Sequence, residues 1–325
     1  MKRFKKIFFV FEDGNSAQIA LQRAISLAEN NKATLTVAAI MPRVSSGVTI
    51  PEGGPEFADL QELFASAKRQ ELEQLIQPYR ERIKLQTTLL VGISFLEIIR
   101  EVLRQGYDLV IKIPETADWL DHLLGSDDMH LLRKCPCPVW LIKPEAPKAY
   151  RRILAAIDVN SDCPQEELNT RMSLNREILE IAVSLALSEF AELHIVQVWH
   201  AVGESAMRGV FLHTSEEKIH AYVEQVREQH AIRFESLIHE TLSTMGQDAV
   251  AYLKPQTHLV KGQARKEIPA LAKQISCDLV VMGTVARTGI PGFIMGNTAE
   301  TILNQLDCSV LAIKPIGFQT PVTLE

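Results

Sequence analysis

A glycine-rich segment near the end of the chain has the residue types of a phosphate-binding loop. It runs Gly283-Thr-Val-Ala-Arg-Thr-Gly-Ile-Pro-Gly-Phe-Ile-Met-Gly-Asn-Thr298 and contains no carboxylate. An apolar, β-branched run, residues 277–282, precedes it, and residues 298–306 follow with apolar residues at helical spacing. This order brings free backbone N–H groups and the positive end of a helix dipole to one place. The segment therefore predicts a site for an anion.

Six residues of this segment are candidates for contact with the phosphate groups of a ligand: Gly283, Thr284, Arg287, Gly296, Asn297 and Thr298. Glycines allow the backbone to approach a ligand closely, and the guanidinium of Arg287 carries positive charge. The alternative is a turn that joins a strand to a helix without a ligand and leaves Arg287 in solvent. The sequence leaves both interpretations open.

An internal repeat supplies the elements that must hold this loop. Residues 5–12 and 151–158 share two basic residues, an apolar run and a closing carboxylate. The two endings match as well, because residues 137–144 and 308–315 both read Cys-x-Val-x-x-Ile-Lys-Pro. The chain is therefore one structural unit used twice.

Each unit alternates strand-like and helix-like stretches, which predicts a parallel sheet with right-handed crossovers. The fold class is α/β, with two tandem doubly wound five-stranded parallel sheets and helices on both faces. The expected strands are residues 5–11, 34–40, 85–91, 107–113, 138–142, 151–157, 192–198, 256–261, 277–282 and 308–313. The expected helices of the second unit are residues 165–189, 214–245, 264–275 and 297–306. The predicted domains are residues 1–146 and 147–315, followed by a tail, 316–325.

Ligands of a doubly wound sheet bind beyond the carboxyl ends of the strands, where the strand order changes direction. Glu12, Asp158 and the loop from Gly283 are all predicted at such places. Asp158 is a candidate for a hydrogen bond to a ribose or to an adenine edge. Alternatively, its side chain caps the turn that follows.

The loop resembles the nucleotide-binding signature of the universal stress protein family, which is G-x-x-G, nine residues, and then G followed by Ser or Thr. The register falls on Gly283, Ala286, Gly296 and Asn297, so the spacing is kept while Ala286 and Asn297 depart from the pattern. Two segments in and around this loop, residues 283–289 and 296–300, are similar to the tandem E-type subfamily in particular, as are residues 130–136 and 319–322 elsewhere in the chain.

This resemblance implies a pseudo-dimer in which the two halves pack through their closing strands. It also implies ATP as a ligand, accompanied by Mg²⁺, with adenine and ribose near Asp158 and the backbone of Val198. The phosphates would lie on the segment from Gly283 to Thr298. For function, the resemblance implies a non-enzymatic role in the stress response and, for the E-type subfamily, tolerance of DNA-damaging conditions.

The first unit lacks the features that favour phosphate. It keeps Gly125-Ser126 at the place of Gly296-Asn297 but has lost the earlier glycines. Like charges in close contact repel each other strongly, so we predict that this unit repels triphosphate and that the second half holds the chain's one competent nucleotide site. Five carboxylates stand there against Lys112: Glu115, Asp118, Asp121, Asp127 and Asp128.

The composition argues against nucleic acids and membranes as binding partners. A net charge of −6 over 325 residues provides no basic stripe for a nucleic-acid backbone, and no apolar run is long enough to span a membrane. We therefore expect neither direct nucleic-acid binding nor a membrane partner. Five cysteines without a Cys-x-x-Cys pair favour a reducing compartment, and the cytoplasm is the expected location.

No catalytic or metal site is expected. Cys135, Cys137 and His130 do not provide the four-ligand set of a structural zinc site. Neither a G-x-x-x-x-G-K-[ST] loop nor a G-x-S-x-G elbow occurs in the sequence. His220 and His230 fall on a polar helical stretch and, with His213, are expected to be exposed.

Three functions remain open from the sequence. The first is a non-enzymatic cytoplasmic stress-response protein whose second domain binds ATP or another small phosphate ligand. The second is a weak nucleotide hydrolase, in which Asp158 would have to hold a metal ion. The third is a module that binds a small molecule or lipid in a first-domain pocket. Whether two chains associate into a homodimer also stays open.

Overall fold

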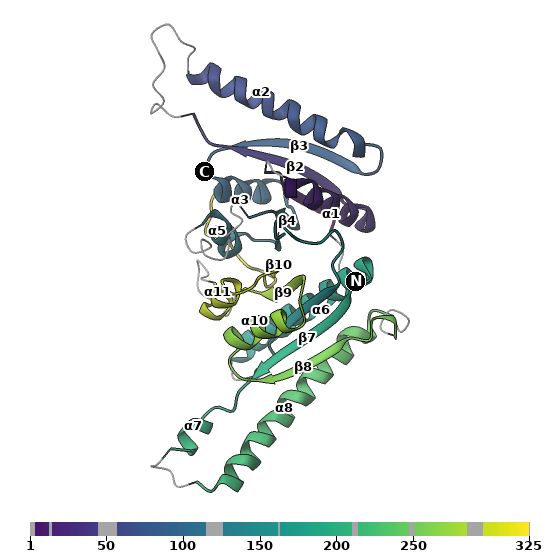
Figure 1. Ribbon diagram of the computed structural model, residues 1–325. Coiled ribbons are helices and arrows are strands. Elements are labelled where there is room, and N and C mark those ends of the chain that lie inside the picture. The colour runs from purple at the N-terminus through teal and green to yellow at the C-terminus, as the bar shows by residue number, and fades with distance from the viewer. Residues whose placement is uncertain are drawn as a thin grey trace.

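The computed structural model describes residues 4–12, 15–44, 57–114, 126–161, 163–209, 214–246, 251–284 and 295–324. Within these residues ten strands form one sheet in the order β3-β2-β1-β4-β5-β10-β9-β6-β7-β8. Figure 1 shows the first domain above and the second below along this sheet. The strands are β1 (Lys6–Val10), β2 (Thr34–Met41), β3 (Lys84–Val91), β4 (Leu109–Lys112), β5 (Val139–Leu141), β6 (Arg152–Ile157), β7 (Glu192–Trp199), β8 (Gln256–Lys261), β9 (Leu279–Gly283) and β10 (Ser309–Ile313).

The helices alternate with the strands, as the repeat pattern predicts. The helix expected at 165–189 is confirmed with these bounds, whereas the helix expected at 297–306 ends three residues earlier. The helices are α1 (Asn15–Asn31), α2 (Phe57–Ile76), α3 (Ser94–Gln105), α5 (Asp127–Lys134), α6 (Gln165–Glu189), α7 (Glu204–Met207), α8 (Glu216–Ser243), α10 (Ala264–Gln274) and α11 (Asn297–Leu303), and one 3₁₀ turn is η1 (Gln77–Tyr79).

The closing strands of the two units form the seam of the molecule. β5 and β10 pair antiparallel, with Trp140 opposite Leu311, whereas the other neighbouring strands pair in parallel. The expected fold class is therefore confirmed, and the two five-stranded sheets join edge to edge into one. Because the strands of the two domains run in opposite directions, their carboxyl ends lie at opposite edges of the shared sheet.

Both faces of the sheet are covered by helices, which explains why its strands are apolar on both sides. Phe8 and Phe9 are adjacent on β1, are both fully buried and belong to different core clusters, since successive strand residues point to opposite faces. The cluster of Phe9 includes residues of α1, α6 and α8, together with Leu72 of α2. The cluster of Phe8 includes residues of α3, α5, α10 and α11.

The long helix α8 covers the sheet over only part of its length. Figure 1 shows it beside β8 at one end and extending toward α7 at the other. Apart from Ile219, the buried residues of α8 begin at His230. The expectation that His230 is exposed was wrong: its ring lies 6.1 Å from that of Trp199 because the second half of the helix packs on the sheet. His220 is exposed as expected, and His213 lies outside the described residues.

Polar contacts also tie the two domains together. Arg133 at the end of α5 pairs with Glu300 of α11 at 2.6 Å. Lys143, which follows β5, pairs with Asp307, which precedes β10, at 2.5 Å. The C-terminal tail returns to the first domain, where Arg100 of α3 donates to the carbonyl oxygen of Thr323. Within the described part of the chain, no helix is long and apolar enough to cross a membrane.

Candidate functional site

The strand order of the second domain changes direction between β6 and β9, which are neighbours in the sheet. Asp158 directly follows β6, and Gly283 is the last residue of β9. β7, which carries Val198, lies on the other side of β6. The structure therefore brings these three predicted residues to one edge of the sheet, at the place where ligands of doubly wound folds bind.

The side chain of Asp158 caps the following turn, which is one of the two roles that the sequence left open. Its Oδ1 atom accepts a hydrogen bond from the backbone N–H of Asn160 at 2.9 Å. Its Oδ2 atom lies 3.4 Å from Nη1 of Arg171, and the side chain is 59% exposed. The carboxylate therefore retains an open side from which it can accept a further hydrogen bond.

Two residues of α6 that sequence reasoning missed hold this corner. The amide of Asn175 accepts from the backbone N–H of Asp158 and donates to its carbonyl oxygen, at 3.1 and 2.7 Å. Arg171 lies one turn earlier on the same face of α6 and donates to the carbonyl oxygen of Asn160 at 2.8 Å. The sequence of α6 indicates only that the helix covers the sheet, so no signal in it marked these two residues.

Val198 lies inside β7 rather than after it, because the strand continues to Trp199. It pairs with Val260 of β8. Its carbonyl oxygen accepts a hydrogen bond from Nε2 of Gln197 at 2.9 Å, and Gln197 is fully buried. The backbone at Val198 is thus held by the sheet and by its neighbour's side chain.

Gly283 allows α6 to approach the end of β9 closely. A Cβ atom at this position would lie 2.7 Å from Cδ2 of Leu174 and 3.7 Å from Cδ1 of Ile178. The glycine is therefore explained by helix–strand packing, which is one of the roles of glycine in nucleotide-binding strand–loop–helix units.

A backbone hydrogen bond closes the neck of the predicted loop. The N–H of Gly296 donates to the carbonyl oxygen of Thr284 at 3.2 Å. Thr284 is 1% exposed, and its hydroxyl accepts from Nζ of Lys314 at 2.6 Å. Lys314 also donates to the carbonyl oxygen of Leu132 in the first domain. Burial lowers the pKa of Lys314 to about 7, although Cys135 and Cys137 act in the opposite direction.

The far side of the neck leads directly into α11. Gly296 is the N-cap residue with ordinary extended torsions, φ −62° and ψ 136°, and its own position provides no side-chain cap. Asn297 and Thr298 are the first two residues of the helix. Arg287 and Ala286 lie outside the described residues, so the predicted phosphate contact of Arg287 stays a prediction.

The first domain fills the equivalent corner with charges. Strand register places Lys112 beside Val10 of β1 and Met282 beside Ala156 of β6, so Lys112 and Met282 are equivalent. Nζ of Lys112 lies 2.6 Å from Oε1 of Glu12 and 2.9 Å from Oδ1 of Asp128. Burial alone lowers the pKa of Lys112, but Asp128 and Glu12 raise it above its ordinary value.

The start of α5 also carries more negative charge than the start of α11. The hydroxyl of Ser126, the N-cap residue, accepts from the N–H of Met129 at 3.2 Å, and Asp127 and Asp128 occupy the first turn. Ser126 and Gly296 are the N-cap residues of these two helices. Glu115, Asp118 and Asp121 lie outside the described residues.

The cysteines that could suggest a metal site are packed in the core. Sγ of Cys135 and Sγ of Cys137 lie 3.6 Å apart, and Cys137 and its repeat equivalent Cys308 are both buried. Among the residues that the structure describes, no group of three or more His, Cys, Asp or Glu side chains could hold a metal ion.

Comparisons with known proteins point to one family. The model of the universal stress protein family matches residues 3–143 and 149–314. The Universal stress protein E homolog of Haemophilus influenzae is 30% identical, over 96% of this chain and 98% of its own length. Universal stress protein E of Escherichia coli is 32% identical, over 71% of this chain and 68% of its own length. The crystal structure of a putative universal stress protein from Pseudomonas aeruginosa gives a TM-score of 0.66 at 26% identity, covering 96% of this chain and 94% of the other.

Proposed function

This chain belongs to the universal stress protein family, with two copies of the family's domain in tandem, and we propose that it acts in the stress response by binding ATP in its second domain without hydrolysing it. The adenine and ribose are placed at Asp158 and Val198, and the phosphates at Gly283, Thr284, Arg287, Gly296, Asn297 and Thr298, with Mg²⁺ bound to the phosphates. The first domain takes no nucleotide.

The contrast between the two equivalent corners carries this proposal. In the first domain, Glu12, Lys112 and Asp128 form an ion cluster between the ends of β1 and β4 and the start of α5. The second domain has Asp158 and Met282 at the positions of Glu12 and Lys112, and α11 begins with Asn297 and Thr298 where α5 begins with Asp127 and Asp128. Of the three charged groups, only the one after the first strand is kept, and it is the group proposed to meet the ribose. The described residues 279–284 and 295–299 contain no carboxylate, and Glu300 in the first turn of α11 is paired with Arg133.

Two basic side chains of the described residues lie near this corner. Arg171 lies beside Asp158, and Lys314 holds the hydroxyl of Thr284 at the neck of the loop. Arg171 adds a positive charge beside Asp158, whereas Lys314, with a pKa lowered to about 7 by burial, is charged in only part of the molecules at neutral pH. In the first domain Lys112 is paired with two carboxylates. A triphosphate is therefore favoured at one end of the molecule and disfavoured at the other.

The experiment uses two substitutions at Gly296 that differ in charge alone. Asp and Asn are both good N-cap residues, and the torsions of Gly296 are accessible to any residue, so both variants should fold and retain or gain stability. Gly296→Asp places a carboxylate beside the phosphates and should weaken ATP binding by at least about tenfold. Gly296→Asn is the matched control and should bind within a few-fold of the unsubstituted chain.

Titration calorimetry with ATP and Mg²⁺ on the full chain gives both affinity and stoichiometry. We expect one ATP per chain. Equal affinity in the Asp and Asn variants would place the site elsewhere, and two ATP per chain would contradict the exclusion of nucleotide from the first domain. Absence of binding in the unsubstituted chain would overturn the proposal.

The same samples test the alternative of a weak hydrolase. After incubation with ATP and Mg²⁺, chromatography of the released nucleotide should recover ATP, since Asp158 is the carboxylate placed at the corner among the described residues and is already engaged by Asn160 and Arg171. Accumulation of ADP that depends on Asp158 would support hydrolysis instead.

The cellular part of the proposal is resistance to DNA-damaging conditions from a cytoplasmic location. The net charge of −6 favours an indirect role over direct contact with DNA. Deletion of the gene should lower survival after ultraviolet irradiation, and restoration by the Gly296→Asn variant but not by Gly296→Asp would link survival to the nucleotide.

A further inference from the structure

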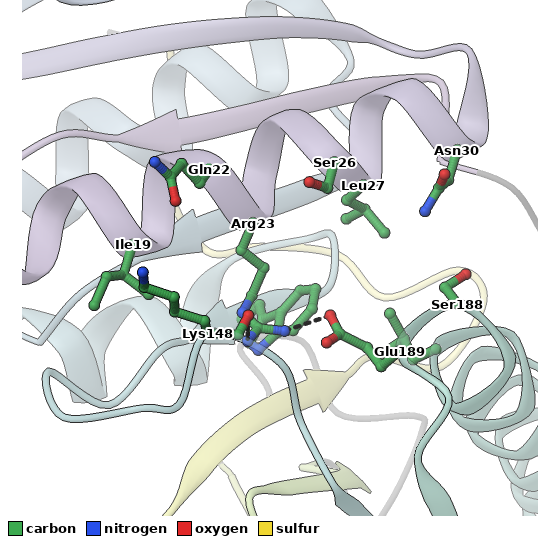
Figure 2. Close-up of a pocket in the computed structure, with 11 residues that line it drawn as sticks. Ile19, Gln22, Arg23, Ser26, Leu27, Asn30, Lys148, Ser188 and Glu189 are labelled. Carbon is green, nitrogen blue, oxygen red and sulfur yellow. Dashed lines mark hydrogen bonds and ion pairs between the residues drawn. The ribbon is translucent and has the colours of Figure 1, made fainter.

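A cavity of about 240 Å³ lies between α1 of the first domain and the C-terminal end of α6 of the second. Figure 2 shows residues of α1 on one side, Ser188 and Glu189 of α6 on the other, and Lys148 of the connecting segment. Trp140 of β5 also lines it. The cavity shares no lining residue with the proposed nucleotide site.

Arg23 forms the charged wall of this cavity. Its side chain is 3% exposed, and Nη1 lies 2.5 Å from Oε1 of Glu189. Nη2 donates to the carbonyl oxygens of Pro147 and Lys148, and the guanidinium lies 3.6 Å from the centre of the Tyr150 ring. The Nε atom is buried and has no acceptor within the described part of the chain. Arg23 is therefore fixed in place, and because its Nε atom is enclosed, the side chain contributes its positive charge to the cavity rather than a free donor.

Uncommitted polar side chains surround this wall. Gln22, Ser26 and Asn30 follow one another at four-residue spacing on α1, and Ser188 faces them from α6. All four are exposed, and none has a side-chain hydrogen bond or ion pair with the residues that the structure describes. Because amide and hydroxyl groups both donate and accept, they match a ligand whose own groups do the same.

The charge of the lining defines the ligand further. Arg23 and Lys148 contribute two positive charges and Glu189 one negative charge. Glu189 is already engaged, since its second oxygen accepts from the N–H of Tyr150 at 3.0 Å. A ligand with one negative charge neutralises the site.

We propose that this interdomain cavity binds a small monocarboxylate that carries several hydroxyl groups, of the sugar-acid class. The carboxylate lies against Arg23 and Lys148, and the hydroxyl groups meet Gln22, Ser26, Asn30 and Ser188. The remaining lining is apolar, including Leu27 and Leu185, and suits the C–H groups of such a ligand. The site is independent of the proposed nucleotide site, so that either can fail without the other.

A ligand in this position contacts both domains and the segment that joins them. It therefore stabilises the native arrangement by mass action, because the assembled cavity exists only when the two domains are docked. We expect a rise in the unfolding midpoint that grows with ligand concentration.

D-Gluconate is the probe, and D-glucose is its neutral counterpart of similar size. Binding to the full chain is measured by ligand-observed NMR and by the shift of the unfolding midpoint. We expect gluconate to bind and glucose to bind at least about tenfold more weakly, because it lacks the charge that meets Arg23 and Lys148. Lys148→Gln should weaken gluconate binding several-fold and leave glucose unaffected.

A steric variant tests the location. Ser26→Phe projects a ring into the cavity from an exposed helix position and should abolish gluconate binding. Ser66→Phe makes the same change at an exposed position on α2, away from the cavity, and should bind normally. Retained binding in Ser26→Phe, equal affinity for gluconate and glucose, or no binding of gluconate at millimolar concentration would overturn the proposal.

Discussion

Nζ of Lys112 lies 2.9 Å from Oδ1 of Asp128, and the two side chains are 1% and 4% exposed. This pair joins the end of β4 to the first turn of α5, and Glu12 adds a second carboxylate at the end of β1. Three elements of the first domain therefore meet at one ammonium group. The equivalent corner of the second domain is the one proposed to bind a ligand. In the first domain this corner is occupied by charged side chains of the protein itself.

Replacing Lys112 tests how much this ion cluster contributes to the free energy of unfolding. Lys112→Met leaves the carboxylate of Asp128 buried without its cation, and we expect the free energy of unfolding to fall by about 3–5 kcal/mol. Urea denaturation measures this change in the free energy of unfolding. Adding Asp128→Asn to the same chain removes the uncompensated charge and should restore a large part of the loss. A cost below about 1 kcal/mol for the single variant would show that the cluster is not effectively buried.

The pair of Arg23 and Glu189 should couple the domains much more strongly than an exposed pair of similar length. A double-mutant cycle with Arg23→Met and Glu189→Gln is expected to give a coupling energy above about 1 kcal/mol, because the arginine is almost completely buried. Arg69 and Glu62 lie 2.8 Å apart but are 55% and 69% exposed, so their cycle should give about 0.5 kcal/mol or less. Equal values for the two cycles would refute the role of burial.

Lys314 should make the stability of the protein rise with pH above neutrality. Its pKa is about 7 in the folded chain and near 10.5 when unfolded. Between these values the unfolded chain binds more protons, so the free energy of unfolding increases by up to about 1.4 kcal/mol per pH unit from this group. Below pH 7 the full cost of burying the charge is present, and above about pH 10.5 it has gone.

Lys314→Met removes this titration while other groups continue to titrate. Urea unfolding of both chains at pH 7, 8 and 9 should therefore show a difference that shifts in favour of the unsubstituted chain as the pH rises. Lys143→Met, at the equivalent lysine of the first unit, is the matched control. A difference that stays constant over this range would mean that Lys314 is protonated in the folded protein throughout.

Gly283→Ala should destabilise the second domain through packing alone. The new methyl group would lie 2.7 Å from Cδ2 of Leu174, the end of a flexible side chain that must move aside. We expect a loss of about 1–2 kcal/mol, measured by thermal unfolding. The cost should shrink when Leu174→Val shortens the opposing side chain. An equal cost in both backgrounds would point to a backbone effect instead.

The strands and their order within each domain could be predicted because local pattern and the repeat agree. Residues 153–157 are apolar on both faces and are followed by Asp158, and their counterpart, residues 7–11, is apolar and followed by Glu12. Two copies of one pattern constrain each other, so the ten expected strands are all present. The junction through the closing strands also followed from the family resemblance.

The parts that the sequence did not reveal depend on contacts between distant segments. Asn175 and Arg171 belong to a helix whose pattern indicates only that it covers the sheet, and their contact with Asp158 requires the bend of the chain after β6. The pairing of Lys112 with Glu12 bridges residues one hundred positions apart. His230 has polar sequence neighbours and became buried because tertiary packing, not local composition, decides which helix face meets the sheet.

The antiparallel seam of β5 and β10 has a consequence for how this protein diverged. In a homodimer joined in this way, one gene encodes both subunits, so that each mutation alters both pockets. In a single fused polypeptide, each half can be mutated independently, while the covalent link keeps the two closing strands together. The corner at the end of β1 can then carry internal ion pairs, as it does at Lys112, without any change to the corner at the end of β6.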